Sequence, residues 1–587
     1  MTESPAHQET PPTVRRFVSR YKAESLCLCL LLVMGANLLS IAWRETVTND
    51  ELVHIPAGYH YIAAGDFSLN PEHPPLVKMW ACLPLLIVRP KVYQLAERGN
   101  EDFAKFTVDA SLEFWQMNQR RYHAIVFWSR VPVVLLTLAL GVLIFVYGRQ
   151  LFGTRAAMLS LAMFTLEPTM LAHGWIVHTD IAAALGYLLF LFALQAYYRK
   201  PTITYALFFS LVTAFALLTK FSLMILAPIF FGAFGLMILR AKRFASSRGR
   251  AALQALLASA VLCVLINAAY FFKHPQLPPA ETNWITQTAT TLSPAHIVGW
   301  IGAFSKVLPT YYLFGNYTVL VHNHFGHPAS LLGRYSNFGW WYYFPTAFAL
   351  KTSLPFLLVS AGAVVWGLWS VLVKREQKVI PLLVAMLIYV LVSMSSNINI
   401  GVRHIAPLFP FLFLLGGAWL DRVWQRTRSR VPLIVVGILL SWMLVDCVRT
   451  YPHYLSFTNS LTFGKPDWQL LSDSNVEWGQ DIGALAQYLH QRGETELVGS
   501  LSGGWAAAEL CDIRLLDFAP PDLQAAGTRY VAIGAGFLNG STVPAGLKDA
   551  HGVELTEEQR RNYFANYRTM APEKVFGNSI YLYRAKE

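Results

Sequence analysis

Charged residues are scarce in this sequence. Asp, Glu, Lys and Arg make up only 14% of the 587 residues, whereas a soluble protein carries about 25%. Hydrophobic residues make up 54%, and the mean hydropathy is +0.39. Together with uncharged runs of about 17 residues or more, this composition excludes a disordered chain and an ordinary soluble enzyme. We therefore expect an integral membrane protein.

Cysteine is also scarce, and acidic residues are outnumbered by basic ones. The six cysteines include no CxxC pair and no spacing that indicates a disulfide framework. The net charge is +12, which in a membrane protein indicates basic cytoplasmic loops first and an anionic substrate second. No basic block with interleaved aromatic residues lies in a polar segment, so nucleic acid is not an expected partner.

Eleven apolar runs are long enough to cross a bilayer. If the N-terminus is cytoplasmic, every short loop on that side is basic, as the positive-inside rule requires. The two runs between 203 and 239 have basic flanks on both sides, so they are predicted to form a tight hairpin with Lys220 at the outer surface. The runs are roughly 25–43, 124–147, 156–171, 181–198, 203–219, 221–239, 251–272, 344–373, 379–395, 404–420 and 431–447.

One apolar run is excluded from this count. The run from Leu76 to Val88 contains Lys78, follows two prolines and is too short to span a bilayer, so it is typical of an interfacial or re-entrant helix. Counting it as a span would move the later basic loops to the outside. The predicted organisation is a cytoplasmic tail at 1–24, a transmembrane domain at 25–448 with outer loops at 44–123 and 273–343, and an outer C-terminal domain at 449–587.

The C-terminal part has the composition of a soluble protein. Apolar strand-like runs alternate in it with helical patterns, which favours a small α/β domain. The predicted helices lie at 481–490 and 556–567, and the predicted strands lie at 497–501, 530–533 and 579–583.

The notable charged residues gather at one level, the outer ends of the predicted spans. Asp50 and Glu51 follow the first span, Asp180 opens the fourth, and Lys220 lies at the tip of the hairpin. Carboxylates and cations at this level can receive the head group of a lipid whose tail stays in the bilayer. The other members of this group are Glu72, His73, Lys78, Glu167, His178, Lys351, Arg403 and His404.

Several of these features also have simpler interpretations. Asp50-Glu51 is consistent with a solvated pair, Pro74-Pro75 with a helix start, and Arg403-His404 with an anchor among lipid head groups. The histidines between 322 and 327 have no standard zinc spacing and no adjacent thiolate or acidic residue, so the sequence does not favour a metal site there. The order of the motifs along the chain therefore carries more weight than any one of them.

Three motifs follow one another in a recognisable order. Asp-Glu at 50–51 is followed by His-Pro-Pro-Leu-Val-Lys at 73–78 and then by Asp180. This order resembles the GT-C superfamily of polytopic glycosyltransferases, and within it the protein O-mannosyltransferases and the bacterial undecaprenyl-phosphate-dependent transferases, including the aminoarabinose transferases that modify lipid A. The resemblance covers roughly 25–490 and includes GWWYYFPTAFALK at 339–351, Arg403-His404 and SDSNVEWGQD at 472–481.

The resemblance implies a GT-C fold and assigns roles to several residues. Asp50 matches the catalytic carboxylate of the first outer loop, Glu51 matches its neighbour, and Asp180 matches the second acidic position. His73 and Lys78 match the segment that helps to shape the sugar and phosphate site. Some relatives use a divalent metal at the first acidic motif and others use none, and the sequence leaves both alternatives open.

The implied reaction moves a sugar from a polyprenyl phosphate to an acceptor hydroxyl on a protein, lipid or polysaccharide. The implied sugar is a hexose, with mannose as one candidate, because aminoarabinose-dependent relatives have Glu-Lys where this chain has Glu72-His73. Asp50 is the expected general base. The family implies inversion at the sugar, although a retaining double displacement stays open. The leaving phosphate needs positive charge, for which the candidates are Lys78, Lys220, Arg334 and Arg403.

The resemblance also implies a location. We expect a bacterial inner membrane, a cytoplasmic N-terminus and a periplasmic C-terminus, with a lipid-linked sugar donor, an acceptor and membrane lipids as partners. A transporter or flippase for lipid-linked sugars is an alternative, but it would place charges deep in several spans and repeat one half in the other. An inactive relative that acts in envelope assembly is a third alternative, which the intact Asp50, Asp180 and Arg403 disfavour.

Overall fold

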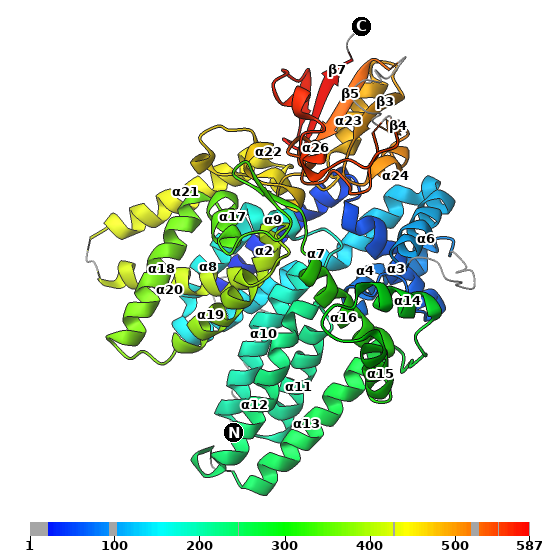
Figure 1. The fold of residues 1–587 in the computed structure, drawn as a ribbon. Coiled ribbons are helices and arrows are strands. Elements are labelled where there is room, and N and C mark those ends of the chain that lie inside the picture. The colour runs from blue at the N-terminus through cyan, green and yellow to red at the C-terminus, as the bar shows by residue number, and fades with distance from the viewer. Residues whose placement is uncertain are drawn as a thin grey trace, which may run out of the picture.

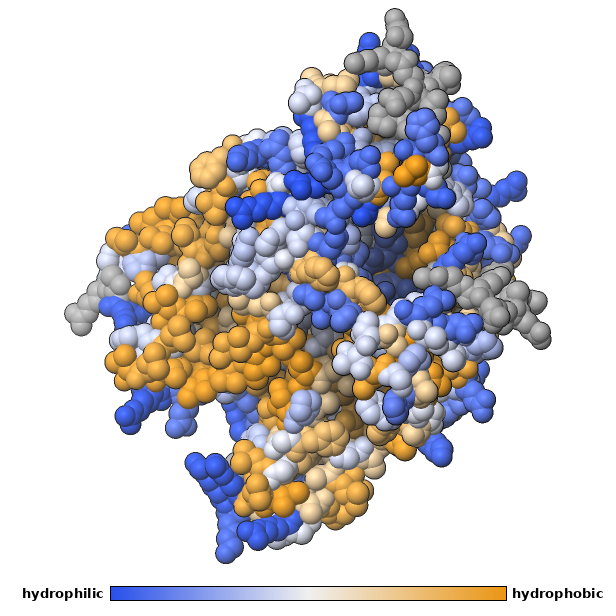
Figure 2. Space-filling view, in the orientation of Figure 1, coloured by the Kyte–Doolittle hydropathy of each residue, from blue (hydrophilic) through white to orange (hydrophobic). Residues whose placement is uncertain are grey.

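The computed structural model describes residues 22–92, 103–244, 246–426, 429–517, 528–549 and 551–585. A bundle of helices carries a small α/β domain at one end (Figure 1). Hydrophobic side chains cover the flanks of the bundle, whereas hydrophilic side chains gather on the α/β domain and at the far ends of α12 (Leu226–Leu239) and α13 (Arg248–Ala269) (Figure 2). A bilayer around the bundle requires such a distribution.

Eight helical segments in the described part of the chain are long and apolar enough to cross a membrane, judged by length and composition. Three shorter apolar helices, α8 (Thr154–Leu166), α11 (Ile203–Leu217) and α19 (Ile380–Met394), fall on further predicted runs. That eleven segments span a bilayer stays a prediction. The eight are Lys22–Arg44 (α2), Lys105–Phe152 (from α6, Phe103–Asn118, to the end of α7, Tyr122–Phe152), Asp180–Arg199 (α10), Phe221–Leu239 (η2, Phe221–Ile225, and α12), Arg248–Ala269 (α13), Leu354–Leu372 (α18), Val402–Arg426 (η4, Val402–Leu408, and α20, Phe409–Arg426) and Val431–Thr450 (α21).

The predicted apolar run at 344–373 forms two helices rather than one. The run consists of α17 (Tyr343–Lys351) and α18, with an extended break at Ser353. Pro355 near the start of α18 has no N–H with which to continue an earlier helix. The N–H and the hydroxyl of Ser353 donate to the Glu167 carboxylate at 3.1 and 2.6 Å, and Glu167 itself lies at the break that follows α8. The two breaks therefore satisfy each other's polar groups in the interior.

The two loops that the sequence predicts to lie outside form short helices rather than further spans. The excluded run at 76–88 is a pair of helices, each too short to cross a bilayer, and its Leu86 and Ile87 are exposed as an interfacial segment requires. The first loop holds α3 (Asn49–Ala64), α4 (Pro75–Cys82), α5 (Leu85–Val88) and α6 (Phe103–Asn118); the second holds α14 (Pro279–Thr288), α15 (Pro294–Phe304), α16 (Thr310–Phe325), β1 (Ala329–Leu331) and β2 (Arg334–Ser336).

The C-terminal domain is the small α/β domain that the sequence predicts. Its five-stranded sheet has the order β4-β3-β5-β7-β6, in which β3 pairs in parallel with β4 and β5, and β7 pairs antiparallel with β5 and β6. The strands are β3 (Glu496–Ser500), β4 (Arg514–Asp517), β5 (Tyr530–Gly534), β6 (Lys574–Phe576) and β7 (Ile580–Arg584), and the helices include α23 (Ile482–His490), α24 (Gly504–Glu509) and α26 (Glu557–Arg561).

This domain is joined by hydrogen bonds to the segment between α2 and α3. The N–H of Thr46 donates to the carbonyl of Gln480 at 3.0 Å, and the N–H of Asn49 donates to the carbonyl of Trp478 at 2.8 Å. The N–H of Gly483 donates to the Thr46 hydroxyl at 2.6 Å. These bonds hold the segment before α23 against the start of α3.

Candidate active site

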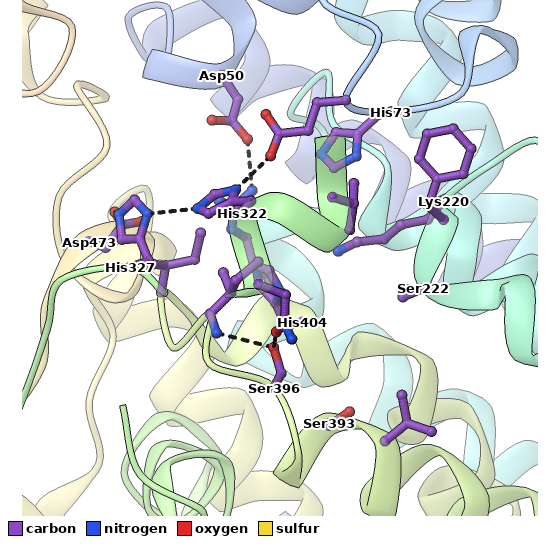
Figure 3. A pocket seen from close by; sticks show the side chains of 18 of the residues that line it. Asp50, His73, Lys220, Ser222, His322, His327, Ser393, Ser396, His404 and Asp473 are labelled. Carbon is purple, nitrogen blue, oxygen red and sulfur yellow. Dashed lines mark hydrogen bonds and ion pairs between the residues drawn. The ribbon is translucent and has the colours of Figure 1, made fainter. Parts of the chain in front are cut away.

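A cavity of about 460 Å³ lies where the α/β domain meets the bundle. Its walls come from α3, α16, α19 and η4 (Val402–Leu408), and Asp473 and Trp478 enter it from the C-terminal part of the chain. The side chains labelled in Figure 3 point into one common space. Six residues predicted from the sequence line it: Asp50, Glu72, His73, Lys220, Arg403 and His404.

Two carboxylates and two cations form one connected network at this cavity. Arg403 Nη1 lies 2.8 Å from Asp50 Oδ2 and 3.7 Å from Asp180 Oδ2. Lys220 Nζ is ion-paired with the other oxygen of Asp180. Asp180 is 1% exposed and stands directly behind the two cations, whereas the side chain of Asp50 is 22% exposed and reaches the cavity. Asp180 therefore orients the cations, and Asp50 remains accessible.

Asp180 occupies a position that favours a negative charge. It is the first residue of α10, where the helix dipole stabilises an anion. His178 Nδ1 accepts the main-chain N–H of Asp180 at 3.0 Å, which fixes the start of the helix. The negative charge of Asp180 is then balanced by Lys220 and Arg403, which come from distant parts of the chain.

Trp478 holds Arg403 from its other side. The guanidinium carbon lies 4.0 Å from the centre of the Trp478 ring, which is the geometry of a cation–π contact. Trp478 is 3% exposed and lines the cavity. The guanidinium is therefore fixed by two carboxylates and an aromatic face before any ligand binds.

Asp50 is ionised at neutral pH. Burial alone would raise its pKa, but the charge and hydrogen bond of Arg403, together with the neighbouring His54 and His73, outweigh burial and hold the pKa below its usual value. Burial lowers the pKa of the neighbouring His54 to about 4 and that of His73 to about 3. The cavity thus offers one carboxylate beside two neutral imidazoles.

A second chain of polar contacts crosses the cavity wall. His322 Nδ1 lies 2.8 Å from Glu72 Oε1, and its Nε2 lies 3.1 Å from His327 Nδ1. His327 Nε2 lies 3.9 Å from Asp473 Oδ2. These contacts connect the loop at 44–123, the loop at 273–343 and the C-terminal part of the chain. Against burial, the hydrogen bond and charge of His322 hold the pKa of Glu72 at about 2.

We expect Glu72→Gln to lower the pKa of His322. In the native protein burial lowers this pKa, but the hydrogen bond and negative charge of Glu72 overcome burial and raise it above its ordinary value. Without the Glu72 carboxylate, burial still lowers the pKa of His322, and only the charge of Asp473 opposes it. Titration of the His322 ring signals by NMR measures the shift, with Glu113→Gln on the exposed face of α6 as the control. An unchanged His322 titration in the Glu72 variant would contradict the pairing.

Glu51 lies away from the cavity. Both of its oxygens are taken by Arg130, at 2.9 and 2.6 Å, and both side chains are fully buried. The same carboxylate accepts the N–H of Thr48 at 2.9 Å in a capping box at the start of α3, and the N–H of Val177 at 3.0 Å. Its contacts are those of a positioning residue, which fixes the turn of α3 that presents Asp50.

We expect Glu51→Gln to destabilise the protein strongly. Removing one partner of a fully buried ion pair leaves the Arg130 charge uncompensated, which costs about 3–5 kcal/mol of unfolding free energy. Thermal unfolding in detergent measures the effect, and Glu113→Gln again supplies the matched control. A melting temperature equal to that of the control would show that Glu51 does not hold the start of α3.

Two further predicted residues are not part of the cavity lining. Lys78 is 1% exposed and donates to the carbonyl of Asn70 at 2.5 Å and to the hydroxyl of Tyr61 at 3.1 Å. Asn70 lines the cavity, so Lys78 supports the wall from behind. Arg334 is exposed on β2, outside the lining.

The structure adds residues to the site that the sequence interpretation omits. His54 lines the cavity and stands four residues after Asp50 on α3, so helical spacing is a signal that would have found it. Tyr389 and Asn323 also line the cavity, but no motif or spacing in the sequence points to them. The acidic partner of His322 is Glu72, which is 250 residues away in the sequence.

A divalent metal at the first acidic motif does not fit these side chains. Arg403 contacts both Asp50 and Asp180, and Lys220 takes the other oxygen of Asp180. Cationic side chains thus already balance the two carboxylates and occupy the space between them.

The fold and the site together define a multi-pass helical membrane protein with a charged cavity beneath a small α/β domain. Residues 126–268 match the model of the family described as dolichyl-phosphate-mannose-protein mannosyltransferase. This match confirms the resemblance to that family over the matched residues, which include Asp180 and Lys220. Comparison with curated proteins finds no match.

Solved structures give weaker likenesses along most of the chain. ArnT from Cupriavidus metallidurans in the apo state has a TM-score of 0.46 and 13% identity, over 96% of this chain and 98% of that chain. The same protein bound to undecaprenyl phosphate has a TM-score of 0.44 and 14% identity, over the same shares. The archaeal oligosaccharyltransferase AglB from Archaeoglobus fulgidus, with an inhibitory peptide and a dolichol-phosphate, has a TM-score of 0.45 and 11% identity, over 88% and 70%. Likenesses at this level do not establish a shared function.

Proposed function

We propose that this protein is a membrane glycosyltransferase that moves a sugar from a polyprenyl-phosphate carrier to an acceptor hydroxyl at the outer face of the membrane. The observation that carries the proposal is the juxtaposition of the accessible Asp50 carboxylate with Arg403 and Lys220 in one cavity. A base and a phosphate-binding pair are the two requirements of this transfer. The family match at 126–268 supports the same class of reaction.

Arg403 and Lys220 bind the phosphate of the donor. A guanidinium fixed on two sides presents its remaining N–H groups in a rigid fork that suits phosphate oxygens, and Lys220 adds a compact charge. As the bond between sugar and phosphate breaks, negative charge grows on the phosphate, and the two cations stabilise it. A phosphate leaves as a weak base, so the reaction needs no acid to protonate it.

Asp50 accepts the proton of the acceptor hydroxyl. A carboxylate with a low pKa is a weak base, and the ion pair with Arg403 makes Asp50 weaker still. When the donor phosphate binds, its negative charge competes for Arg403 and opposes the charge of Asp50. Both effects raise the pKa of Asp50 toward the range in which a general base is effective, so donor binding activates the base.

The carrier lipid reaches the bilayer through the apolar side of the cavity. Leu320 on α16 and Val392 on α19 line the cavity and are 68% and 38% exposed. Hydrophobic side chains that open outward on a membrane-facing surface suit a prenyl chain. The phosphate thus stays with Arg403 while the lipid tail leaves between α16 and α19.

The finer features of the reaction follow the family resemblance. The sugar is a hexose, with mannose as the leading candidate; a direct displacement inverts the sugar carbon; and the acceptor is a protein, a lipid or a polysaccharide. Mass spectrometry of envelope glycoproteins, lipids and polysaccharides from cells with and without this protein tests the function. The loss of one sugar from one class of molecule supports it and identifies the acceptor. Identical glycan profiles would overturn it.

A further inference from the structure

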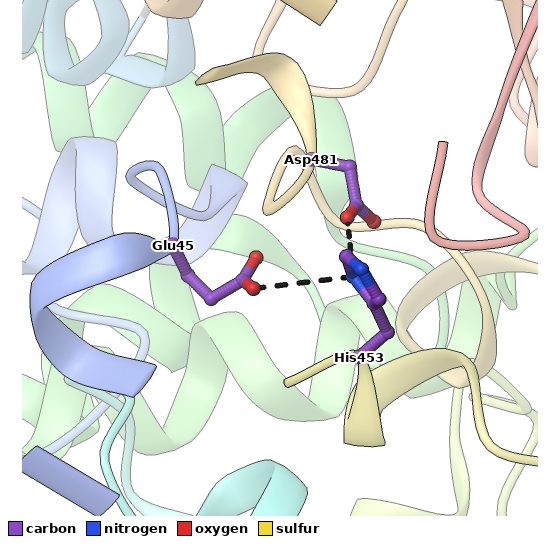
Figure 4. A group of neighbouring side chains, drawn as sticks. All are labelled: Glu45, His453 and Asp481. Carbon is purple, nitrogen blue, oxygen red and sulfur yellow. Dashed lines mark ion pairs between the residues drawn. The ribbon is translucent and has the colours of Figure 1, made fainter. Parts of the chain in front are cut away.

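A second group of ionisable side chains lies outside the cavity, at the joint between the bundle and the α/β domain. Glu45 follows α2, His453 follows α21, and Asp481 immediately precedes α23; the three side chains converge (Figure 4). Among the described residues, this is the one set of at least three His, Cys, Asp or Glu side chains whose potential ligand atoms lie within 4.8 Å of one another. Neither the family match nor the cavity accounts for it.

Two polar atoms of this group are buried and lack a well-formed hydrogen bond, although the His453 side chain as a whole is 39% exposed. His453 Nδ1 lies 2.8 Å from Asp481 Oδ1 and 4.0 Å from Glu45 Oε1, yet neither His453 Nδ1 nor Asp481 Oδ1 has a hydrogen bond of acceptable geometry in the described part of the chain. The side chains of Asp481 and Glu45 are 1% and 6% exposed. The other oxygen of Asp481 accepts the Ser579 hydroxyl at 2.6 Å, which aims Oδ1 at the group. A buried carboxylate oxygen held only by a poorly aligned ion pair is costly, so a further cation at the group would stabilise it.

The nearby cationic side chains do not supply this further positive charge. Arg130 is occupied by Glu51 and by the main-chain carbonyl of Glu45, at 2.7 Å, and Arg44 lies over the ring of Tyr451. Two buried carboxylates therefore share a single imidazole. A divalent cation would compensate both negative charges and use the open atoms.

The donor set identifies the class of cation. One imidazole nitrogen with two carboxylate oxygens is typical of zinc and similar transition metals, whereas calcium and magnesium prefer oxygen alone. Ligand atoms around a tetrahedral zinc stand roughly 3.3 Å apart, given metal–ligand distances of about 2.0 Å. The Glu45 oxygen, at 4.0 Å from His453 Nδ1, is within a small side-chain rotation of that separation.

We propose that Glu45, His453 and Asp481 bind a divalent transition-metal cation of the zinc class, which clamps the α/β domain to the bundle. Glu45 belongs to the segment that leads into Asp50, and Asp481 lies three residues after Trp478. The main-chain bonds from Thr46 and Asn49 to Gln480 and Trp478 run between the two segments. The cation would thus fix the spacing of two cavity walls. The proposal does not depend on the sugar transfer, because binding is measured without a donor.

The test uses the purified full-length protein in detergent, stripped of metal with a chelator and titrated with Zn²⁺ alone. The variants are His453→Gln and Glu45→Gln, with His490→Gln on the exposed side of α23 as the control. All are made in a His322→Ala background, which removes the histidine that links Glu72 to His327 in the cavity wall. We expect one Zn²⁺ per chain in the background and control proteins, an affinity weaker by about tenfold or more in both ligand variants, and a rise in melting temperature with Zn²⁺ that the ligand variants lose.

Two readouts keep the proposal falsifiable. Melting temperatures recorded without metal show whether each variant is folded. If one ligand variant does not fold, the other alone is sufficient to test the site. Equal Zn²⁺ affinity and an equal thermal shift in the ligand variants and the control would overturn the site. So would the failure of the background protein to bind Zn²⁺ at all.

Discussion

Asp50→Asn should reduce the rate of sugar transfer by roughly 10²–10⁴-fold, which is the usual contribution of a general base. Asparagine has the shape of aspartate and retains an oxygen for the Arg403 guanidinium, which lies 2.8 Å from the native carboxylate. It cannot accept the proton of the acceptor hydroxyl. Turnover of a polyprenyl-phosphate sugar by the purified variant measures the effect. The apparent affinity for the donor should change far less than the rate.

A matched substitution separates this effect from general damage. Asp109→Asn makes the same chemical change on the exposed face of α6, away from the cavity. This variant should keep the wild-type rate, and both variants should melt near the wild-type temperature. Full activity of Asp50→Asn would remove Asp50 from the role of base.

Arg403→Lys should weaken donor use by about 10–100-fold, as expected from the loss of one charged hydrogen bond. Lysine keeps the positive charge that the neighbouring Asp50 and Asp180 require, so the variant is expected to fold. It cannot contact both carboxylates and lie flat over Trp478, as the native guanidinium does. The effect should appear as a higher KM for the donor together with a lower kcat, because the same fork binds the phosphate and stabilises its growing charge.

Arg334→Lys is the control for this prediction. The sequence gives Arg334 and Arg403 the same role as phosphate-binding candidates, but Arg334 lies exposed on β2, outside the cavity lining. Its conservative variant should retain wild-type KM and kcat. If the Arg334 variant loses donor binding and the Arg403 variant does not, the assignment of the phosphate site is wrong.

The membrane part of the fold could be predicted because its signal is local. Low charge and long apolar runs locate the helices, and each predicted run overlaps at least one apolar helix. The break at Ser353 could not be predicted in the same way, since the break depends on Glu167, a distant side chain that satisfies its polar groups. The strands β4 and β6 are not among the predicted strands. They are only four and three residues long, which is too short for an alternating pattern to be recognised.

The site shows the same division between local and distant information. Asp50, Asp180, Lys220 and Arg403 are predicted from their positions at helix ends, and the fold brings them together. The sequence cannot distinguish Glu51 from Asp50, because only the fold reveals that successive residues of α3 face Arg130 and the cavity. Glu72, the acidic partner of His322, and Arg403, the partner of Trp478, lie far along the chain from them and have no local signal.

The most direct test of the proposed chemistry is a mass balance on the donor. Proteoliposomes containing the purified protein are incubated with a panel of polyprenyl-phosphate hexoses, mannose first, and with an envelope extract that supplies acceptors; free polyprenyl phosphate and new glycosides are then quantified by mass spectrometry. We predict that the wild-type protein releases one polyprenyl phosphate for each sugar transferred, and that Asp50→Asn releases almost none. Intact donor lipid that has only moved from one leaflet to the other would contradict the account and identify a transporter.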